Sequence, residues 1–379
     1  MMNARFYFAL LIVSSLWACG GDSVTTPEQP ALERGLHEVG NLTRPRYWHA
    51  ATLLQNGKVL IAGGLEELPV VLEGPPPPNT AIPQPKRLIS AEIFDPETGI
   101  STPTGDLAAS RSEDHGILLP DGRVLIIPGN PNLPIERYDA HSGRFNPVAV
   151  LPGRIGILTA TLLLDGKVFL TSTLYAGVFD PTTGPFSPLL RMDPSRIGHT
   201  ATLLKDGRVL IVGGQNVGRD AGLLGRNLIY DPSTEALSEA GNLQFDRRNH
   251  KAVLLDDGRV LIIGGGGAGR GPFVQTAEIY DPEANTFSPA GVSTIDPSAA
   301  LLLPSGDVFL IRSYNGDIVL YDPATHTFSN TGYSISPRRS FATATLLEDG
   351  RVMVAGGIKW RDDNHDWESI TDQIFIFTP

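Results

Sequence analysis

Short apolar runs occur in pairs along this chain, and a two-residue polar turn separates the members of each pair. In the best-preserved copy, residues 201–204 (Ala-Thr-Leu-Leu) and 209–212 (Val-Leu-Ile-Val) flank Asp206-Gly207. Asp-Gly between such runs is typical of a two-residue β-hairpin turn with positive φ. The arrangement recurs seven times, at Asn56-Gly57, Asp121-Gly122, Asp165-Gly166, Asp206-Gly207, Asp257-Gly258, Ser305-Gly306 and Asp349-Gly350. A repeat of this kind decides the architecture of the chain.

Each copy continues with two further predicted strands. The third strand alternates apolar and polar residues, as in 277–280 (Ala-Glu-Ile-Tyr), and ends in an aromatic-Asp-Pro motif. A turn and a short fourth strand follow, as in 286–289 (Thr-Phe-Ser-Pro), where the proline fits an outer edge. The first two strands are apolar on both faces and should be buried. Radial stacking of four-stranded units buries both faces, which predicts an all-β, seven-bladed β-propeller.

The two ends of the chain complement each other. The last unit has three predicted strands and stops at Phe377-Thr378-Pro379, where other units have aromatic-Asp-Pro. Residues 36–42 (Leu-His-Glu-Val-Gly-Asn-Leu) resemble residues 237–243 (Leu-Ser-Glu-Ala-Gly-Asn-Leu) of a fourth strand. We therefore expect the N-terminal segment to supply the outer strand of the seventh blade. This strand would close the ring and leave no free edge.

The repeat resembles a known family. Arg-x-x-His-x-Ala-x-x-Leu-x-Asp-Gly, an apolar strand, Gly-Gly and then Tyr-Asp-Pro is similar to the kelch repeat of bacterial secreted proteins and of the central domain of galactose oxidase. The resemblance covers residues 36–379, and four units carry the glycine pair: Gly63-Gly64, Gly213-Gly214, Gly264-Gly265 and Gly356-Gly357. It implies a propeller over residues 35–379. It does not imply one activity, because kelch propellers serve many.

The N-terminus indicates export. Residues 1–18 combine a basic start with an apolar run and small residues, which is typical of a signal peptide. Leu16-Trp17-Ala18-Cys19 resembles the lipobox of bacterial lipoproteins, in which the cysteine is acylated, although Trp17 is unusual there. Residues 19–34 then form a flexible tether. Gly20 in place of Asp favours the outer membrane by the same resemblance, with the propeller periplasmic or surface-exposed. Ordinary secretion, without lipid on Cys19, is the alternative.

Charge narrows the classes of partner. The chain has 41 acidic and 30 basic residues, a net charge of −11. An acidic surface disfavours nucleic acid, because binding to a phosphate backbone needs clustered Lys and Arg. Beyond the lipid anchor, we expect a glycan or protein ligand and a monomer, without a cofactor.

One face of the predicted disc carries the short turns, and the other carries the links between second and third strands. These links are long in blades one, four, five and seven, at residues 65–88, 215–226, 266–273 and 358–371. Binding residues usually lie on loops that a rigid scaffold positions. We therefore place the candidate site on the long-loop face.

The link of the seventh blade is the richest in chemistry. It contains Trp360, Asp362, Asp363, His365, Asp366 and Trp367. Trp48 enters the first strand of the neighbouring blade one, so three tryptophans are expected at one junction. Aromatic faces beside carboxylates suit sugar recognition. The alternatives are that the aromatics only anchor the loop, or that the oxygen-rich residues bind Ca²⁺; we expect no metal, because the spacing lacks a glycine-centred calcium loop.

Polar residues recur just before the first strand of most blades. Arginine occupies one repeat position and histidine the position three residues later: Arg46, His49, Arg111, Arg196, His199, Arg247, His250 and Arg339. One interpretation is a polar ring at the channel mouth that binds an anion. The preferred interpretation is structural, with each residue hydrogen-bonded to a neighbouring loop.

Two functional classes remain. A copper-radical site like that of galactose oxidase needs a cysteine bonded to tyrosine, and the only cysteine here, Cys19, lies in the signal region. Nucleophile, zinc and phosphate-binding motifs are absent from the sequence. We favour a non-catalytic binding or scaffold propeller. The alternative is a sugar-modifying, epimerase-like enzyme, with Asp362, Asp366, Glu113, Asp114 or the arginines as acid–base groups.

Overall fold

Apolar β-strands connected by tight turns build the whole described part of the chain. The computed structural model describes residues 33–68, 85–152, 156–217, 222–267, 273–293, 295–313, 315–360 and 367–379. The signal peptide, Cys19 and most of the predicted tether lie outside these residues. So do Asp362, Asp363, His365 and Asp366. Within the described ranges no helix is long and apolar enough to cross a membrane.

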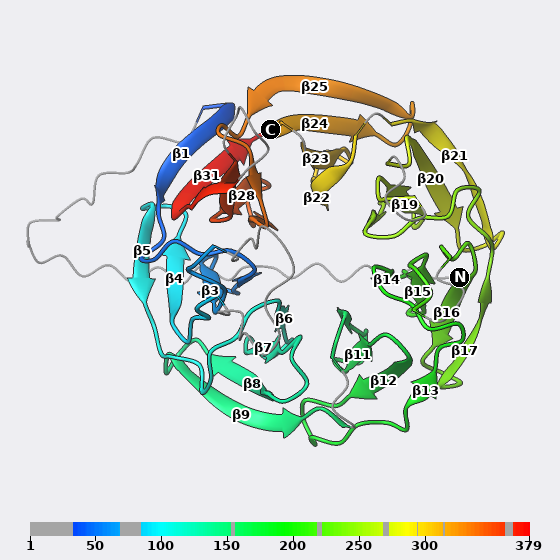
Figure 1. The fold of residues 1–379 in the computed structure, drawn as a ribbon, viewed down its shortest axis with the longest axis horizontal. Coiled ribbons are helices and arrows are strands. Elements are labelled where there is room, and N and C mark those ends of the chain that lie inside the picture. Colours follow the sequence, from blue (N-terminus) through cyan, green and yellow to red (C-terminus); the bar gives the residue numbers. More distant parts are fainter. Residues whose placement is uncertain are drawn as a thin grey trace, which may run out of the picture. The chain divides into compact units, whose positions relative to one another are not determined.

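Seven four-stranded antiparallel sheets are arranged around a central channel (Figure 1). Blade 1 contains β2 (Ala50–Leu53), β3 (Val59–Ala62), β4 (Ala91–Asp95) and β5 (Ile100–Pro103). Blade 2 contains β6 (His115–Leu118), β7 (Val124–Ile127), β8 (Pro134–Asp139) and β9 (Arg144–Val150). Blade 3 contains β10 (Thr159–Leu162), β11 (Val168–Thr171), β12 (Tyr175–Phe179) and β13 (Leu190–Arg191). Blade 4 contains β14 (Thr200–Leu203), β15 (Val209–Val212), β16 (Asn227–Asp231) and β17 (Ala236–Ala240).

The remaining blades continue the ring. Blade 5 contains β18 (Lys251–Leu254), β19 (Val260–Ile263), β20 (Thr276–Asp281) and β21 (Thr286–Val292). Blade 6 contains β22 (Pro297–Leu302), β23 (Val308–Arg312), β24 (Asp317–Asp322) and β25 (Thr327–Ser334). Blade 7 contains β27 (Thr343–Leu346), β28 (Val352–Ala355), β31 (Gln373–Thr378) and β1 (Gly35–Asn41). The prediction of a seven-bladed β-propeller is confirmed.

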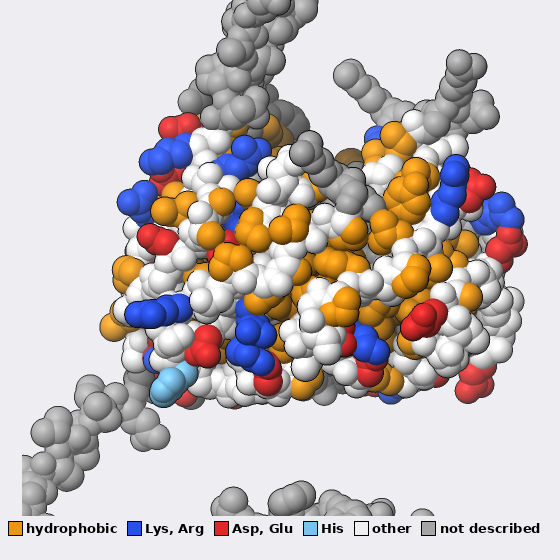
Figure 2. All heavy atoms as spheres, turned by 90° about the horizontal axis from the view of Figure 1, so that it is seen from below, with side chains coloured by type: hydrophobic (Ala, Val, Ile, Leu, Met, Phe, Trp, Pro, Cys, Tyr) orange, Lys and Arg blue, Asp and Glu red, His pale blue; other side chains and the backbone are white. Residues whose placement is uncertain are grey.

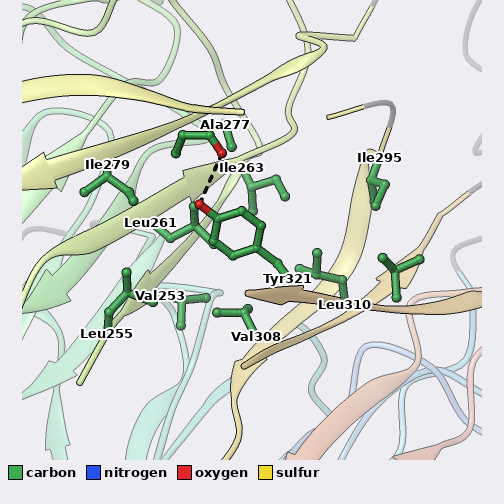
Figure 3. Close-up of a cluster of buried hydrophobic side chains, with 12 residues drawn as sticks. Val253, Leu255, Leu261, Ile263, Ala277, Ile279, Ile295, Val308, Leu310 and Tyr321 are labelled. Atoms are coloured by element: carbon green, nitrogen blue, oxygen red, sulfur yellow. Dashed lines mark hydrogen bonds between the residues drawn. The ribbon is translucent and has the colours of Figure 1, made fainter. Parts of the chain in front are cut away.

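The second strand of each blade is buried on both faces. In β19, Leu261 and Ile263 pack toward blade 6, whereas Val260 and Ile262 pack toward blade 4. Figure 3 shows the cluster between blades 5 and 6, where Leu261 lies near Val308 and Leu310. In the same cluster the hydroxyl of Tyr321 donates a hydrogen bond to the carbonyl of Ala290 at 3.1 Å. Each fully buried aliphatic side chain contributes about 1.5–3 kcal/mol to folding, so these clusters hold the blades together.

The N-terminal strand closes the ring. β1 pairs antiparallel with β31, from Gly35 opposite Thr378 to Asn41 opposite Gln373. Leu36 packs beside the cluster formed by blades 6 and 7. The seventh blade is thus made from both ends of the described chain, as the sequence predicts.

The short turns gather on one face of the disc, which we call the turn face; the opposite face, with the long second-to-third links, is the loop face. On the turn face, the Asp-Gly turns are stabilised by local pairs such as Arg208 with Asp206 and Arg259 with Asp257. Seen from the side, basic and acidic side chains lie next to each other along the lower edge of the disc, below an apolar middle band (Figure 2). These pairs offset charge within several Asp-Gly turns, whereas Asp231 and Asp322 of the Asp-Pro turns form no salt bridge with a described residue.

The seventh-blade link differs from the predicted open loop. β26 (Arg339–Ser340), β29 (Ile358–Trp360) and β30 (Trp367–Ile370) form an additional three-stranded sheet above the blade. Ile358 lies opposite Ile370, and Trp360 lies opposite Trp367. Aromatic and β-branched pairs of this kind stabilise antiparallel strands, which explains the pairing of β29 with β30.

Deletion of residues 31–43 should destabilise the protein, because it removes the outer strand of blade 7 and exposes the edge of β31. We expect the melting temperature to fall by more than about 5 °C, since 1 kcal/mol corresponds to about 2–4 °C in domains of 150–250 residues. Thermal unfolding followed by circular dichroism measures this change. Deletion of residues 2–30 is the matched control and should leave it unchanged; equal melting of both truncations would contradict ring closure by β1.

Candidate functional site

Five blades place a residue with left-handed backbone at the same repeat position, two residues after the arginine. These residues, which we call the mouth ring, are Trp48 (φ 52°), Glu113 (φ 61°), Gly198 (φ 69°), Asn249 (φ 57°) and Phe341 (φ 60°). They stand at the loop-face entrance to the first strands. A positive φ is uncommon for bulky side chains such as Trp and Phe, and such strain often occurs at functional sites.

Backbone hydrogen bonds between blades hold the mouth ring. The amide of Trp48 donates to the carbonyl of Phe341 at 3.4 Å, and the amide of Glu113 donates to the carbonyl of Trp48 at 2.9 Å. The amide of Asn249 donates to the carbonyl of Gly198 at 2.7 Å. The left-handed backbone is therefore fixed by the neighbouring blade, and it leaves Glu113, Asn249 and Phe341 exposed at the mouth.

A cavity of about 560 Å³ lies below the mouth ring in the central channel. Its wall comes from the first strands of blades 2 to 5 and contains His115, Thr159, Thr200 and Lys251, with Asn249 at its rim. Aspartate and glutamate do not occur among its described lining residues. The volume falls within the range of about 300–1,000 Å³ that is usual for small-molecule sites.

The three tryptophans meet at the junction of blades 7 and 1. The ring of Trp48 lies 4.7 Å from that of Phe341 and 5.4 Å from that of Tyr47, measured between centroids. Trp48 and Trp367 both pack on one buried cluster, formed by Tyr47, Leu65 and Ile358. The junction is thus an aromatic surface, half-buried against the body of the propeller.

Trp360 contacts both the loop and the body. Its indole N–H donates to the hydroxyl of Ser340 at 2.8 Å, and the Arg338 guanidinium lies 4.7 Å from the ring centroid. The rings of Trp360 and Trp367 are 6.3 Å apart in an edge-to-face arrangement. These contacts anchor the loop, while the carboxylates predicted beside the tryptophans lie outside the described residues.

The repeated arginines are buried inside their own blades and do not line the cavity. Arg46 donates to the carbonyls of Gly63 at 2.9 Å and Ser90 at 3.0 Å, and pairs with Glu92 at 2.7 Å. Each of the others likewise donates to carbonyls of its own blade. All five side chains belong to residues that are 5% exposed or less: Arg46, Arg111, Arg196, Arg247 and Arg339. These contacts favour the structural interpretation of the ring.

The repeated histidines join neighbouring blades. His49 Nε2 is hydrogen-bonded to Thr343 Oγ1 at 2.9 Å, and His250 Nε2 to Thr200 Oγ1 at 2.9 Å. His199 Nε2 is instead hydrogen-bonded at 2.6 Å to Thr171 Oγ1, at the end of the second strand of blade 3. Burial lowers the pKa of His49, His199 and His250 to about 3, so all three are neutral in the folded protein at physiological pH.

Asp114 takes the histidine position in blade 2, and the usual partner is missing there. The residue of blade 1 equivalent to Thr343 and Thr200 is Ala50, which has no hydroxyl. The Asp114 side chain is 1% exposed, and neither oxygen accepts a hydrogen bond of normal geometry from a described residue. The nearest cation is Arg111, 3.9 Å away. Burial raises the pKa of Asp114 to about 7, with opposition from Arg111.

Asp114 therefore makes stability depend on pH. Its pKa is raised above the unfolded value, so the folded state holds the proton more tightly and the free energy of unfolding decreases as pH rises from about 4 to about 7. Between pH 5 and pH 8, the free energy of unfolding should therefore fall by about 2–3 kcal/mol less in Asp114→Asn than in the native protein, because one pKa unit corresponds to about 1.4 kcal/mol. Urea unfolding at the two pH values measures it. Asp106→Asn, at an exposed position, is the control; an unchanged pH dependence in Asp114→Asn would contradict the assignment.

Comparison with known proteins supports the fold. Residues 247–291, which include most of blade 5, match the family model of the kelch motif. No curated protein sequence matches the chain.

Three solved structures are similar over most of the chain. A fungal alcohol oxidase of the AA5 family in complex with copper is 16% identical, with a TM-score of 0.67 over 92% of this chain and 77% of that one. A streptogramin B lyase is 13% identical, with a TM-score of 0.63 over 90% and 96%. A catalytically inactive virginiamycin B lyase from Staphylococcus aureus with quinupristin is 13% identical, with a TM-score of 0.63 over 92% and 100%. At such identity the likeness concerns the fold alone, and with the motif match it supports a kelch-repeat β-propeller.

Proposed function

We propose that this protein is a non-catalytic binding propeller that recognises a carbohydrate at the loop-face mouth of its channel. The observation that carries the proposal is the mouth ring, which sets aromatic faces next to polar groups above a cavity of about 560 Å³. Trp48 and Phe341 offer surfaces on which a sugar ring stacks. Glu113 and Asn249 are exposed on the same ring and bond to hydroxyl groups.

The geometry of the ring supports a role beyond packing. A left-handed backbone costs roughly 1–3 kcal/mol at each residue that is not glycine. Four residues of the ring are not glycine, and Trp48 and Phe341 are the least suited to it. A purely structural turn would be served by glycine, which blade 4 uses in Gly198. Retention of large and polar side chains at this position favours a binding role for them. The aromatic junction of blades 7 and 1 extends the same surface.

The sequence adds a cell-envelope location to this proposal. Residues 1–18 and Cys19 carry it, through their likeness to a lipoprotein signal, and Gly20 favours the outer membrane. A propeller held at the envelope is suited to bind a polysaccharide or a protein that displays one. A protein ligand without sugar is the second form of the same function, because exposed aromatic residues also serve protein interfaces.

A sugar-modifying enzyme is the alternative function. The desolvated carboxyl of Asp114, with its pKa raised to about 7, favours it, because general acids and bases have such values. The location of Asp114 opposes it: the side chain is 1% exposed and does not line the cavity. The similar oxidase and lyases are compatible with catalysis on this fold but assign none here.

Asparagine substitutions at the mouth test the binding proposal without backbone strain. Asn249 already adopts φ 57° at the equivalent position, so Trp48→Asn and Phe341→Asn add no backbone strain and should keep the fold, which circular dichroism checks. Each should weaken binding of oligosaccharides at least tenfold, as measured by a glycan array followed by calorimetry. Phe273→Ala, at a 62% exposed aromatic of blade 5, is the matched control.

Sugar binding that survives in both asparagine variants would contradict the mouth as the site. Absence of sugar binding in the native protein, together with capture of a protein partner that both variants lose, would replace the carbohydrate with a protein ligand. Turnover of a bound sugar that Asp114→Asn abolishes would establish the enzymatic alternative.

Lipidation is tested separately. After expression with the complete N-terminus in a bacterium that processes lipoproteins, the protein should incorporate an alkyne-labelled fatty acid and partition into detergent. Cys19→Ala should abolish both, because no other cysteine is present to accept the acyl chain. Secretion of an unlabelled, water-soluble native protein would contradict the anchor.

A further inference from the structure

Lys251 places a basic side chain in the wall of the channel cavity. It begins β18 and occupies the repeat position that is threonine in blades 4 and 7, at Thr200 and Thr343. The cavity lining includes Lys251 together with His115, His199 and His250. Burial lowers the pKa of each of these histidines, so they are neutral. Within the described lining, Lys251 is the one lysine or arginine.

Within the described part of the chain, Lys251 has no ion-pair partner. Asp296 of blade 6 is the acidic residue that acts on it from a distance, and one oxygen of Asp296 accepts a hydrogen bond from the Gly265 amide at 3.0 Å. Burial lowers the pKa of Lys251, as expected for an ammonium that has lost water without gaining a close carboxylate. A cation in this state favours an anionic ligand.

We propose that the ligand of the mouth is an acidic sugar, a uronic acid or a related carboxylated residue, whose carboxylate pairs with the Lys251 ammonium in the cavity. This inference rests on the proposed carbohydrate site and names its substrate class. The cavity reaches from the mouth ring, through Gly198 and Asn249, down to Lys251. Lys251 and Asn249 thus line one cavity, which has room for the carboxylate of a sugar bound at this part of the mouth.

The other groups of the cavity suit the same ligand. The exposed amide of Asn249 provides donors and an acceptor at the rim. The hydroxyls of Thr159 and Thr200 keep hydrogen-bonding capacity beyond their bonds to Thr171 and His250. The lining lacks carboxylates in its described part, so nothing there repels an anion. The net charge of the whole chain is −11. The basic side chain in the cavity is therefore the local feature that distinguishes acidic from neutral sugars.

A matched pair of sugars tests the inference. D-galacturonate and D-galactose differ in the carboxylate and the hydroxymethyl group at C6, so their difference in affinity isolates the charge. Calorimetry on the full chain at low ionic strength should show at least tenfold tighter binding of galacturonate. The panel also includes glucuronate with glucose and mannuronate with mannose, because the stereochemistry of the sugar is a separate property.

Lys251→Thr is the informative variant, because threonine occupies this position in blades 4 and 7 and is expected to fold there. It should abolish the preference for the acidic member of the pair, whereas Lys251→Arg should keep it. Lys58→Met is the control, at a 43% exposed lysine of the turn face. An unchanged preference in Lys251→Thr overturns the inference.

The remaining outcomes separate this inference from the proposed function. Equal affinity for acidic and neutral sugars, with loss of both in Trp48→Asn, overturns the anionic ligand and keeps the carbohydrate site. A preference for uronates that needs Lys251 but survives in Trp48→Asn supports the anion site and removes the stacking surface. Failure of all three uronates to bind at millimolar concentration overturns the inference.

Discussion

The burial of each second strand between two neighbouring blades is the constraint on which this structure depends. In β19, alternate side chains pack against blade 4 and blade 6, so neither face of the strand is exposed to solvent. A single blade cannot satisfy such a strand, and an open row of blades would leave two apolar faces exposed. The ring must close, and the ladder between β1 and β31 closes it. The mouth ring follows from closure, because its backbone hydrogen bonds run from one blade to the next.

Local chemistry explains why most of the fold could be predicted from the sequence. The Asp-Gly turns fix the hairpins, and the likeness of residues 36–42 to residues 237–243 identifies the strand that completes blade 7. The pair β29 and β30 was not predicted, although it extends a pairing that blades 1, 4 and 5 make as single bridges, Leu65 with Arg87, Gln215 with Leu223 and Gly266 with Phe273. Ile358 and Ile370, which face each other in this pair, are residues typical of strands. Comparison with the four main strands of the other blades nevertheless assigns both residues to a loop.

The candidate site was less predictable, because its members share a backbone conformation and not a type of side chain. Trp48, Glu113 and Phe341 have nothing chemical in common, and only the glycine and asparagine at the same position hint at a left-handed residue. The spacing of the arginines correctly placed them near the loop-face end of each blade. It did not indicate that their side chains are buried, as that of Arg46 is inside blade 1, where it pairs with Glu92. Lys251 could not be recognised as a site residue from the sequence, because the repeat position it occupies is threonine in blades 4 and 7.

Departures from the repeat give a symmetric scaffold its individual chemistry. Where the threonine and histidine positions are both filled, as in Thr200 and His250, the inner junction is neutral and its side-chain bond is satisfied. Lys251 and Asp114 replace these residues with ionisable ones that no close side-chain partner neutralises. Such departures make individual junctions of the ring chemically different from the rest.

Closure by the first strand also sets a direction. β1 begins at Gly35, opposite Thr378, and runs from the turn face to Asn41 at the loop face. The chain therefore enters the propeller through the turn face, on the side opposite the mouth ring.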